Sequence, residues 1–131
     1  MKKKRKYYVF LIVLLLMTTY IVYGYTIGFS CKFVLSNNFF TFHNPNLFPT
    51  NPDLTILVNE ELLTQLNMPS DRLHEYVVIN KKLIIGYNYI LAESDSMSVY
   101  NARRFFILYP RNIHIGLYST LSHKHMGIAI Y

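Results

Sequence analysis

Cysteine is almost absent from the sequence, since Cys31 is the only one among 131 residues. A single cysteine excludes an intramolecular disulfide and a metal site built from several thiolates. Glycine is also sparse, and the five glycines are too scattered to form a phosphate-cradling loop, a dinucleotide fingerprint or a nucleophile elbow. With these motifs missing, we expect a protein that is not an enzyme, holds no cofactor and derives its stability from apolar burial.

Acidic residues are absent from the first 31 positions, which carry five cations at positions 2–6. The following hundred residues carry eight Lys and Arg against seven Asp and Glu, so five of the six net positive charges belong to the N-terminal tail. A domain that binds nucleic acid usually presents a basic face, because neutralising phosphates supplies much of its affinity. We therefore expect no nucleic-acid partner.

A charge-free run extends from Tyr7 to Cys31, 25 residues in all. As a helix it would be about 37 Å long, enough to cross a hydrocarbon core of about 30 Å. Tyrosines stand near both ends, where their rings favour the headgroup interfaces. The run predicts a cytoplasmic tail at 1–6 and a transmembrane anchor at 7–29, with these residues in the span: Tyr7, Phe10, Leu14, Met17, Tyr20, Tyr23 and Phe29.

The charge bias predicts the orientation of a single-pass membrane protein. Five cations precede the apolar run and only Lys32 follows it within twenty residues, so the N-terminus is expected in the cytoplasm and the rest of the chain outside. Abundant Lys, Asn, Ile and Tyr suggest, by composition only, an AT-rich gene of a bacterium or phage. Together with the predicted orientation, this places the span in a bacterial inner membrane and the domain in the periplasm. Two alternatives keep the same compartment: a cleaved signal peptide, with Gly28 and Ser30 as small residues around Phe29, and a lipid on Cys31 after cleavage.

The segment 30–53 combines aromatic residues with Pro45, Pro49 and Pro52. Prolines at this density disfavour a helix or a central strand. An aromatic and proline-rich tether is therefore predicted between the anchor and an extracytoplasmic domain at 54–131.

The domain at 54–131 has the pattern of mixed helix and strand. We predict a strand at 54–58, a helix capped by Asn59 with three leucines on one face, and a hairpin of 76–79 and 83–91 around a turn at 80–82. A polar connection at 93–101, a strand at 105–109 and a second hairpin of 113–121 and 126–131 complete it. The predicted fold class is α+β: an N-terminal transmembrane helix, then a small, mostly antiparallel sheet of about five or six strands with one short helix.

Aromatic residues are in excess beyond the anchor, with seven Tyr and seven Phe among residues 32–131. A small domain buries most of its aromatics, and those left exposed mark partner surfaces. Arginine adds bidentate recognition of anionic groups. The candidates for partner binding are Tyr87, Tyr89, Tyr100, Arg103 and Arg104.

Histidine offers only a weak metal site. His123 and His125 would share one face of a strand, and His114 would be a third ligand across the second hairpin. No carboxylate or thiol accompanies them in the sequence, which favours a solvated turn.

The pattern as a whole predicts a membrane-tethered domain that binds another protein. It would be an accessory or regulatory subunit of a larger membrane or secreted protein, or an immunity protein that neutralises a toxin. The alternative is a small apolar-ligand or lipid-sensing domain, with a pocket lined by Tyr87, Tyr89 and Leu62.

Overall fold

The chain begins with one long helix and continues as eight strands. The structure, a computed structural model, describes residues 2–39, 51–68, 76–119 and 123–131. The helix is α1 (Lys2–Thr26), and nearly all of its side chains are exposed. The strands are β1 (Phe29–Phe39), β2 (Asp53–Val58), β3 (Glu61–Asn67), β4 (Tyr76–Leu83), β5 (Gly86–Ser94), β6 (Val99–Ile107), β7 (Asn112–Ser119) and β8 (Lys124–Ile130).

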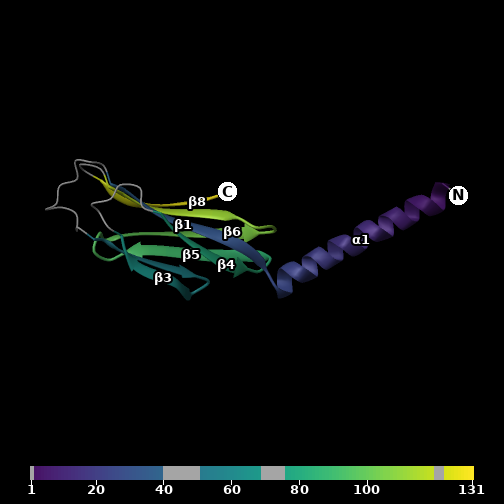
Figure 1. The fold of residues 1–131 in the computed structure, drawn as a ribbon, viewed down its shortest axis with the longest axis horizontal. Helices are drawn as coiled ribbons and strands as arrows, with labels where there is room; N and C mark the ends of the chain where they lie inside the picture. The colour runs from purple at the N-terminus through teal and green to yellow at the C-terminus, as the bar shows by residue number, and fades with distance from the viewer. Residues whose placement is uncertain (1, 40–50, 69–75, 120–122) are drawn as a thin grey trace.

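The strands form two four-stranded sheets that lie one over the other, as Figure 1 shows. Sheet A has the order β4-β1-β7-β8 and is mixed, because β1 is antiparallel to β4 but parallel to β7. Sheet B has the order β3-β2-β5-β6 and is antiparallel throughout. The expected α+β class and strand-rich domain are confirmed, but the single sheet of five or six strands is two sheets of four.

Alternating burial explains why the sheets stack. In β2 every second residue is buried, and in β7 Ile113, Ile115 and Leu117 are buried in the same alternation. The inner faces meet in one apolar cluster, to which sheet B contributes residues such as Ile56 and Ile90. Each such side chain contributes about 1.5–3 kcal/mol relative to the exposed state. The core therefore lies between the sheets.

The predicted helix after Asn59 is wrong, because β2 turns directly into β3. Val58 pairs with Glu61, so Asn59 and Glu60 alone form the turn, with φ of 52° and 68°. Two positive φ values are those of a type I′ turn, which matches the twist of a hairpin. The Asn59 side chain also accepts a hydrogen bond from the Tyr89 amide at 2.9 Å, which fastens the turn to β5.

The predicted hairpin around residues 80–82 is also wrong. Strand β4 runs through these residues to Leu83, and β4 and β5 belong to different sheets. Asn80 and Lys82 point outward from an edge strand, where polar residues are tolerated, so they are compatible with an unbroken strand. The chain instead crosses between the sheets at Ile84 and Ile85. The second predicted hairpin is confirmed as β7 and β8.

The predicted polar connection at 93–101 contracts to a short turn at 95–98 between β5 and β6. Part of the predicted tether is a core strand as well, because β1 lies centrally in sheet A between β4 and β7. Its alternate residues Cys31, Phe33 and Leu35 are fully buried, which outweighs the tether-like composition. Residues 40–50, with two of the three prolines, lie outside the described residues.

Side chains link the two sheets at both edges of the stack. On one side, Asn101 and Arg103 of β6 donate hydrogen bonds to the carbonyls of Met126 and Ile128 in β8, at 2.9 and 2.8 Å. These carbonyls belong to an edge strand of sheet A, and pairing them protects that edge. On the other side, the Lys81 ammonium of β4 lies 3.1 Å from a Glu61 carboxylate oxygen of β3.

Helix α1 has the length and composition of a membrane-crossing helix and fits either a signal anchor or a signal sequence. It ends at Thr26, three residues earlier than predicted. Phe29, expected in the span, is instead the first residue of β1 and only 6% exposed. Its ring packs against Tyr20 and Tyr23 of the helix, with centroids 5.1 and 6.1 Å away.

Candidate partner-binding surface

The outer face of sheet B carries an apolar row that crosses all four strands. Leu62, Leu57, Leu91 and Ala102 are direct neighbours in register, one from each of β3, β2, β5 and β6. The residues on either side of Leu57 and of Leu91 are buried in the core, so the row points outward. Leu62 is 59% exposed and Ala102 is exposed, while the two central leucines are half-buried.

Aromatic side chains extend this row toward the end of the sheet that adjoins the helix. Tyr87 of β5 lies opposite Phe106 of β6, and their rings meet edge to face with centroids 5.1 Å apart. The Arg104 guanidinium lies 4.4 Å from the centre of the Tyr87 ring, a cation–π contact. Tyr87 is 67% exposed. We call the whole surface the leucine–tyrosine face: Leu57, Leu62, Tyr87, Tyr89, Leu91, Ala102, Arg104 and Phe106.

The outer face of sheet A has a different character. A row across it contains Asn80, Lys32 and Asn112, directly opposed and all exposed. Further along, Gly116 and Gly127 oppose each other beneath the Tyr118 ring, which lies where a Cβ on either glycine would stand. The row through Lys32 is thus polar, whereas the neighbouring row of sheet A pairs Val34 with the exposed Val78.

Four of the five predicted partner-binding residues share one face. Tyr87, Tyr89 and Arg104 belong to the leucine–tyrosine face, and Tyr100, 77% exposed, lies on the same side near its border. Arg103 is the exception, because its side chain does not belong to this face. Adjacent residues of a strand point to opposite sides, and the Arg103 guanidinium is bound to the Ile128 carbonyl.

The apolar pocket expected between Tyr87, Tyr89 and Leu62 is not formed. All three side chains are exposed on the open outer face of sheet B, so they enclose no cavity. They offer a flat surface, which suits a macromolecular partner better than a small ligand.

The histidines do not converge. His114 lies opposite Ala129, whereas His125 lies opposite Tyr118, which separates the two histidines by about 13 Å along the strands. The rings stack locally instead: His125 lies on Tyr118 with centroids 4.8 Å apart, and His114 meets Tyr131 edge to face at 5.3 Å. In the described parts of the chain, no three His, Cys, Asp or Glu side chains come together, His123 included.

Cys31 is fully buried in β1, and this burial raises the pKa of its thiol, despite an opposing contribution from nearby Arg111. A neutral, enclosed thiol is a weak nucleophile. A lipid on this sulfur would require β1 to leave the centre of sheet A. The remaining predicted span residues, from Tyr7 to Tyr23, lie on α1 with exposed side chains.

The Asp53 carboxylate accepts several hydrogen bonds from the β5–β6 turn. Burial works to raise the pKa of Asp53, but hydrogen bonds from the Ser96 hydroxyl and from the Ser96 and Asp95 amides outweigh it and lower the pKa to about 2. The hydrogen bonds from the Ser96 and Asp95 amides to the carboxylate oxygens of Asp53 are 2.8 and 3.0 Å long. These hydrogen bonds hold the β5–β6 turn against the start of β2, so the role of the Asp53 carboxylate is structural.

Comparisons of the chain with protein-family models, with curated proteins and with solved structures find no match. Function is therefore inferred from the leucine–tyrosine face and from the junction between α1 and the sheets.

Proposed function

We propose that this protein is a membrane-anchored binding domain that stands outside the cytoplasm and acts as an accessory or regulatory subunit of a larger membrane or secreted protein. The observation that carries the proposal is the apolar row of Leu62, Leu57, Leu91 and Ala102 across sheet B. The leucine–tyrosine face is the surface that takes the partner.

Composition supports this use of the face. Interface cores are enriched in aromatic residues and arginine and depleted in lysine and acidic residues. The face has two tyrosines, one phenylalanine and one arginine among its eight residues, and neither lysine nor acid. Contiguous apolar patches on the surface of a protein mark interaction sites, and the row of Leu62, Leu57, Leu91 and Ala102 is contiguous across all four strands of sheet B.

The contacts of α1 support retention of the anchor. Gly24 is buried against Ile85, whose amide donates a hydrogen bond to the Gly24 carbonyl at 3.0 Å. Tyr20 and Tyr23 cover Phe29. Cleavage near residue 28 would strip these partners from Ile85 and Phe29 and expose both to water, at a cost of the order of 1.5–3 kcal/mol for each side chain. The orientation rests on the cations at 2–6.

A matched pair of variants tests the proposal. Leu62 of β3 and Val78 of β4 are exposed apolar residues of edge strands, and they lie on the outer faces of different sheets. The full-length protein is cross-linked in its own membranes, and captured proteins are identified for wild type, Leu62→Gln, Tyr87→Ala and Val78→Gln.

We expect Leu62→Gln and Tyr87→Ala to lose a captured protein that Val78→Gln retains, with unchanged thermal stability of all three variants. The proposal fails if all three variants capture the same proteins as the wild type. It also fails if Val78→Gln loses the same protein as the other two, because the effect would then not belong to one face.

A further inference from the structure

Helix α1 packs directly against one end of the two stacked sheets, which together we call the sandwich. We call this end, formed by the β4–β5 and β6–β7 connections, the base. The Tyr20 hydroxyl donates a hydrogen bond of 2.8 Å to the Leu108 carbonyl, in the connection between β6 and β7. Gly24 contacts Ile85, in the connection between β4 and β5. Gly28, with φ of +80°, leads directly into β1. Both connections therefore lie alongside the last two turns of the helix.

The length of the helix then determines how close the sandwich must come to a bilayer. From Tyr7 to Thr26 there are 20 residues, about 30 Å of helix, which equals the hydrocarbon thickness. Tyr20 lies six residues before Thr26, about 9 Å nearer the membrane centre. If the β6–β7 connection stood clear of the bilayer, only Tyr7 to Tyr20 would remain to span it. That is about 21 Å, and tilting would shorten the span further.

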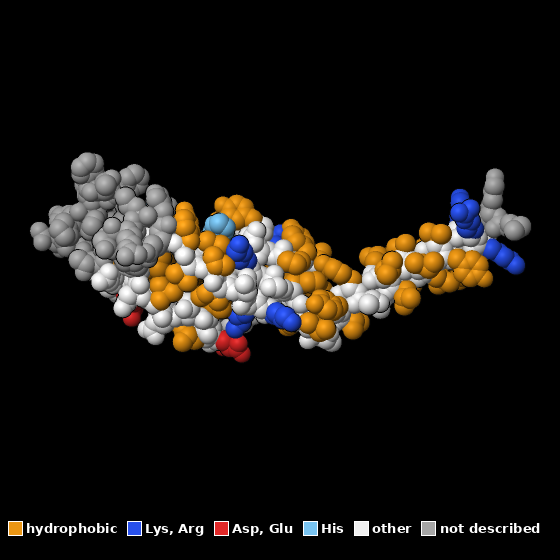
Figure 2. All heavy atoms as spheres, in the orientation of Figure 1, with side chains coloured by type: hydrophobic (Ala, Val, Ile, Leu, Met, Phe, Trp, Pro, Cys, Tyr) orange, Lys and Arg blue, Asp and Glu red, His pale blue; other side chains and the backbone are white. Residues whose placement is uncertain are grey.

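The side chains at this base are of the kind that an interfacial layer accepts. Ile84, Leu108 and Tyr109 are 53%, 49% and 50% exposed in the two connections. Figure 2 shows hydrophobic side chains gathered where the helix meets the strands. Arg111 lies over the Tyr109 ring, 4.7 Å from its centre, and donates a hydrogen bond to its hydroxyl. A tyrosine paired with arginine suits the headgroup level, where the ring meets acyl chains and the cation meets phosphate.

We propose that the β4–β5 and β6–β7 connections seat the sandwich in the lipid headgroup layer, with Ile84, Leu108 and Tyr109 in contact with the acyl-chain boundary. This inference rests on the proposed function, since it needs a retained anchor. The exposed apolar side chains of these two connections therefore contact the bilayer, because the helix that crosses the bilayer packs against the same connections.

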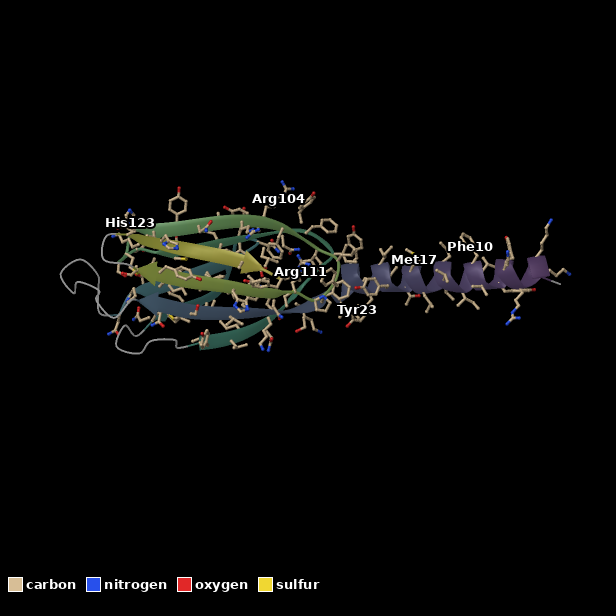
Figure 3. All side chains as sticks on the ribbon, turned by 90° about the horizontal axis from the view of Figure 1, so that it is seen from above. Phe10, Met17, Tyr23, Arg104, Arg111 and His123 are labelled. Atoms are coloured by element: carbon tan, nitrogen blue, oxygen red, sulfur yellow. The ribbon has the colours of Figure 1, made fainter. Side chains whose placement is uncertain are left out.

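This position of the sandwich in the headgroup layer also determines how far the leucine–tyrosine face lies from the lipid surface. In Figure 3 the helix continues in the direction of the strands and Tyr23 lies where they meet, and in Figure 1 the helix leaves this end of the sheets at a slant. Tyr87 and Phe106 are one register position from the helix end of sheet B. The face then stands upright on the membrane with its aromatic end at the lipid surface, which favours a partner embedded in the same membrane.

The absence of tryptophan from the chain makes a direct test available. Single tryptophans are introduced as Leu108→Trp, Ile84→Trp, Phe10→Trp and Tyr100→Trp, and each full-length variant is reconstituted into phosphatidylcholine vesicles with and without bromine on the acyl chains near the headgroup. Phe10 reports on the span itself. Tyr100 lies seven residues before Ile107 on β6, about 24 Å further from the helix.

We expect bromine to quench the tryptophans at positions 108 and 84, at a depth within about 5–10 Å of the headgroup boundary, and to leave position 100 unquenched. Quenching at 10 without quenching at 108 and 84 would overturn the seating and leave the anchor intact. No quenching at 10 would overturn the anchor and with it the proposed function. Quenching at 100 as well as 108 would overturn the upright position, because the sandwich would then lie flat on the lipid.

Discussion

Arg103 and Arg104 are adjacent in β6 but should differ sharply in what they contribute to stability. Arg103 satisfies the Ile128 carbonyl on the edge strand β8 with a charged hydrogen bond of 2.8 Å. Arg104 lies on the opposite side over the exposed Tyr87 ring. Replacement of each by glutamine, Arg103→Gln and Arg104→Gln, removes the same charge from the same strand, so the pair isolates the role of position.

The magnitude depends on the interaction that each change removes. A hydrogen bond from a charged donor is worth about 1.5–3 kcal/mol, and the exposure of Arg103 favours the lower value, about 1.5 kcal/mol. For a domain of about a hundred residues this corresponds to a fall in Tm of about 6–12 °C. An exposed cation–π contact is worth about 0.5 kcal/mol, so Arg104→Gln should lower Tm by no more than about 4 °C. Asn101→Ala, which removes the neighbouring neutral bond to Met126, should fall between them.

Thermal unfolding of the full-length variants in detergent micelles, followed by the β-sheet signal in circular dichroism, measures these differences. Val78→Gln serves as a control for a surface change of no structural consequence. Equal shifts for the two arginine variants, or a larger shift for Arg104→Gln, would refute the assignment of Arg103 to the edge of β8.

Three further outcomes are expected. Asp53→Asn should lower the free energy of unfolding by about 1 kcal/mol at neutral pH. The pKa of Asp53 is lowered to about 2 in the folded state, against about 3.9 in the unfolded state. Its contribution to the free energy of unfolding is therefore complete above about pH 3.9 and is lost as the pH falls toward 2. Urea titrations of wild type and variant should give the same stability near pH 2. Cys31 should resist maleimide at neutral pH and react fully in denaturant; rapid labelling of the native protein would contradict its burial. Gly28→Ala should destabilise the protein by about 1–3 kcal/mol, because φ is +80° and the new Cβ would stand 2.8 Å from the Leu83 carbonyl oxygen; an unchanged Tm would show that the junction adapts freely.

Some features of the fold follow from local pattern alone. The charge-free run after five cations predicts the helix, because a long apolar segment has few other stable forms. The period-two alternation at 113–121 and 126–131 predicts the β7–β8 hairpin, because adjacent residues of a strand face opposite sides. Alternation also places Tyr87 with Tyr89 on one side of β5, and Tyr100 with Arg104 on one side of β6, whereas the β5–β6 register brings the two pairs to the same face.

Other features depend on contacts between segments far apart in the sequence. The type I′ turn at Asn59 and Glu60 is one such feature. Glutamate is not typical of the second position of this turn, where φ is 68°. The hydrogen bonds from Asn59 to β5 stabilise the turn only once the sheet has formed. The tether-like composition around β1 conceals a central strand, because the pairing of β1 with β7 bridges about eighty residues.

The long apolar helix, the charge bias at its start and the strand-rich character of the rest of the chain can all be read from the sequence, because they depend on the hydropathy and periodicity of neighbouring residues. The division into two sheets, the burial of Cys31 and Phe29, the separation of Arg103 from Arg104 and the apolar row across sheet B are visible only in the folded chain. Those features arise from strand pairing and from the packing of the inner faces, which bring together residues that no local pattern relates.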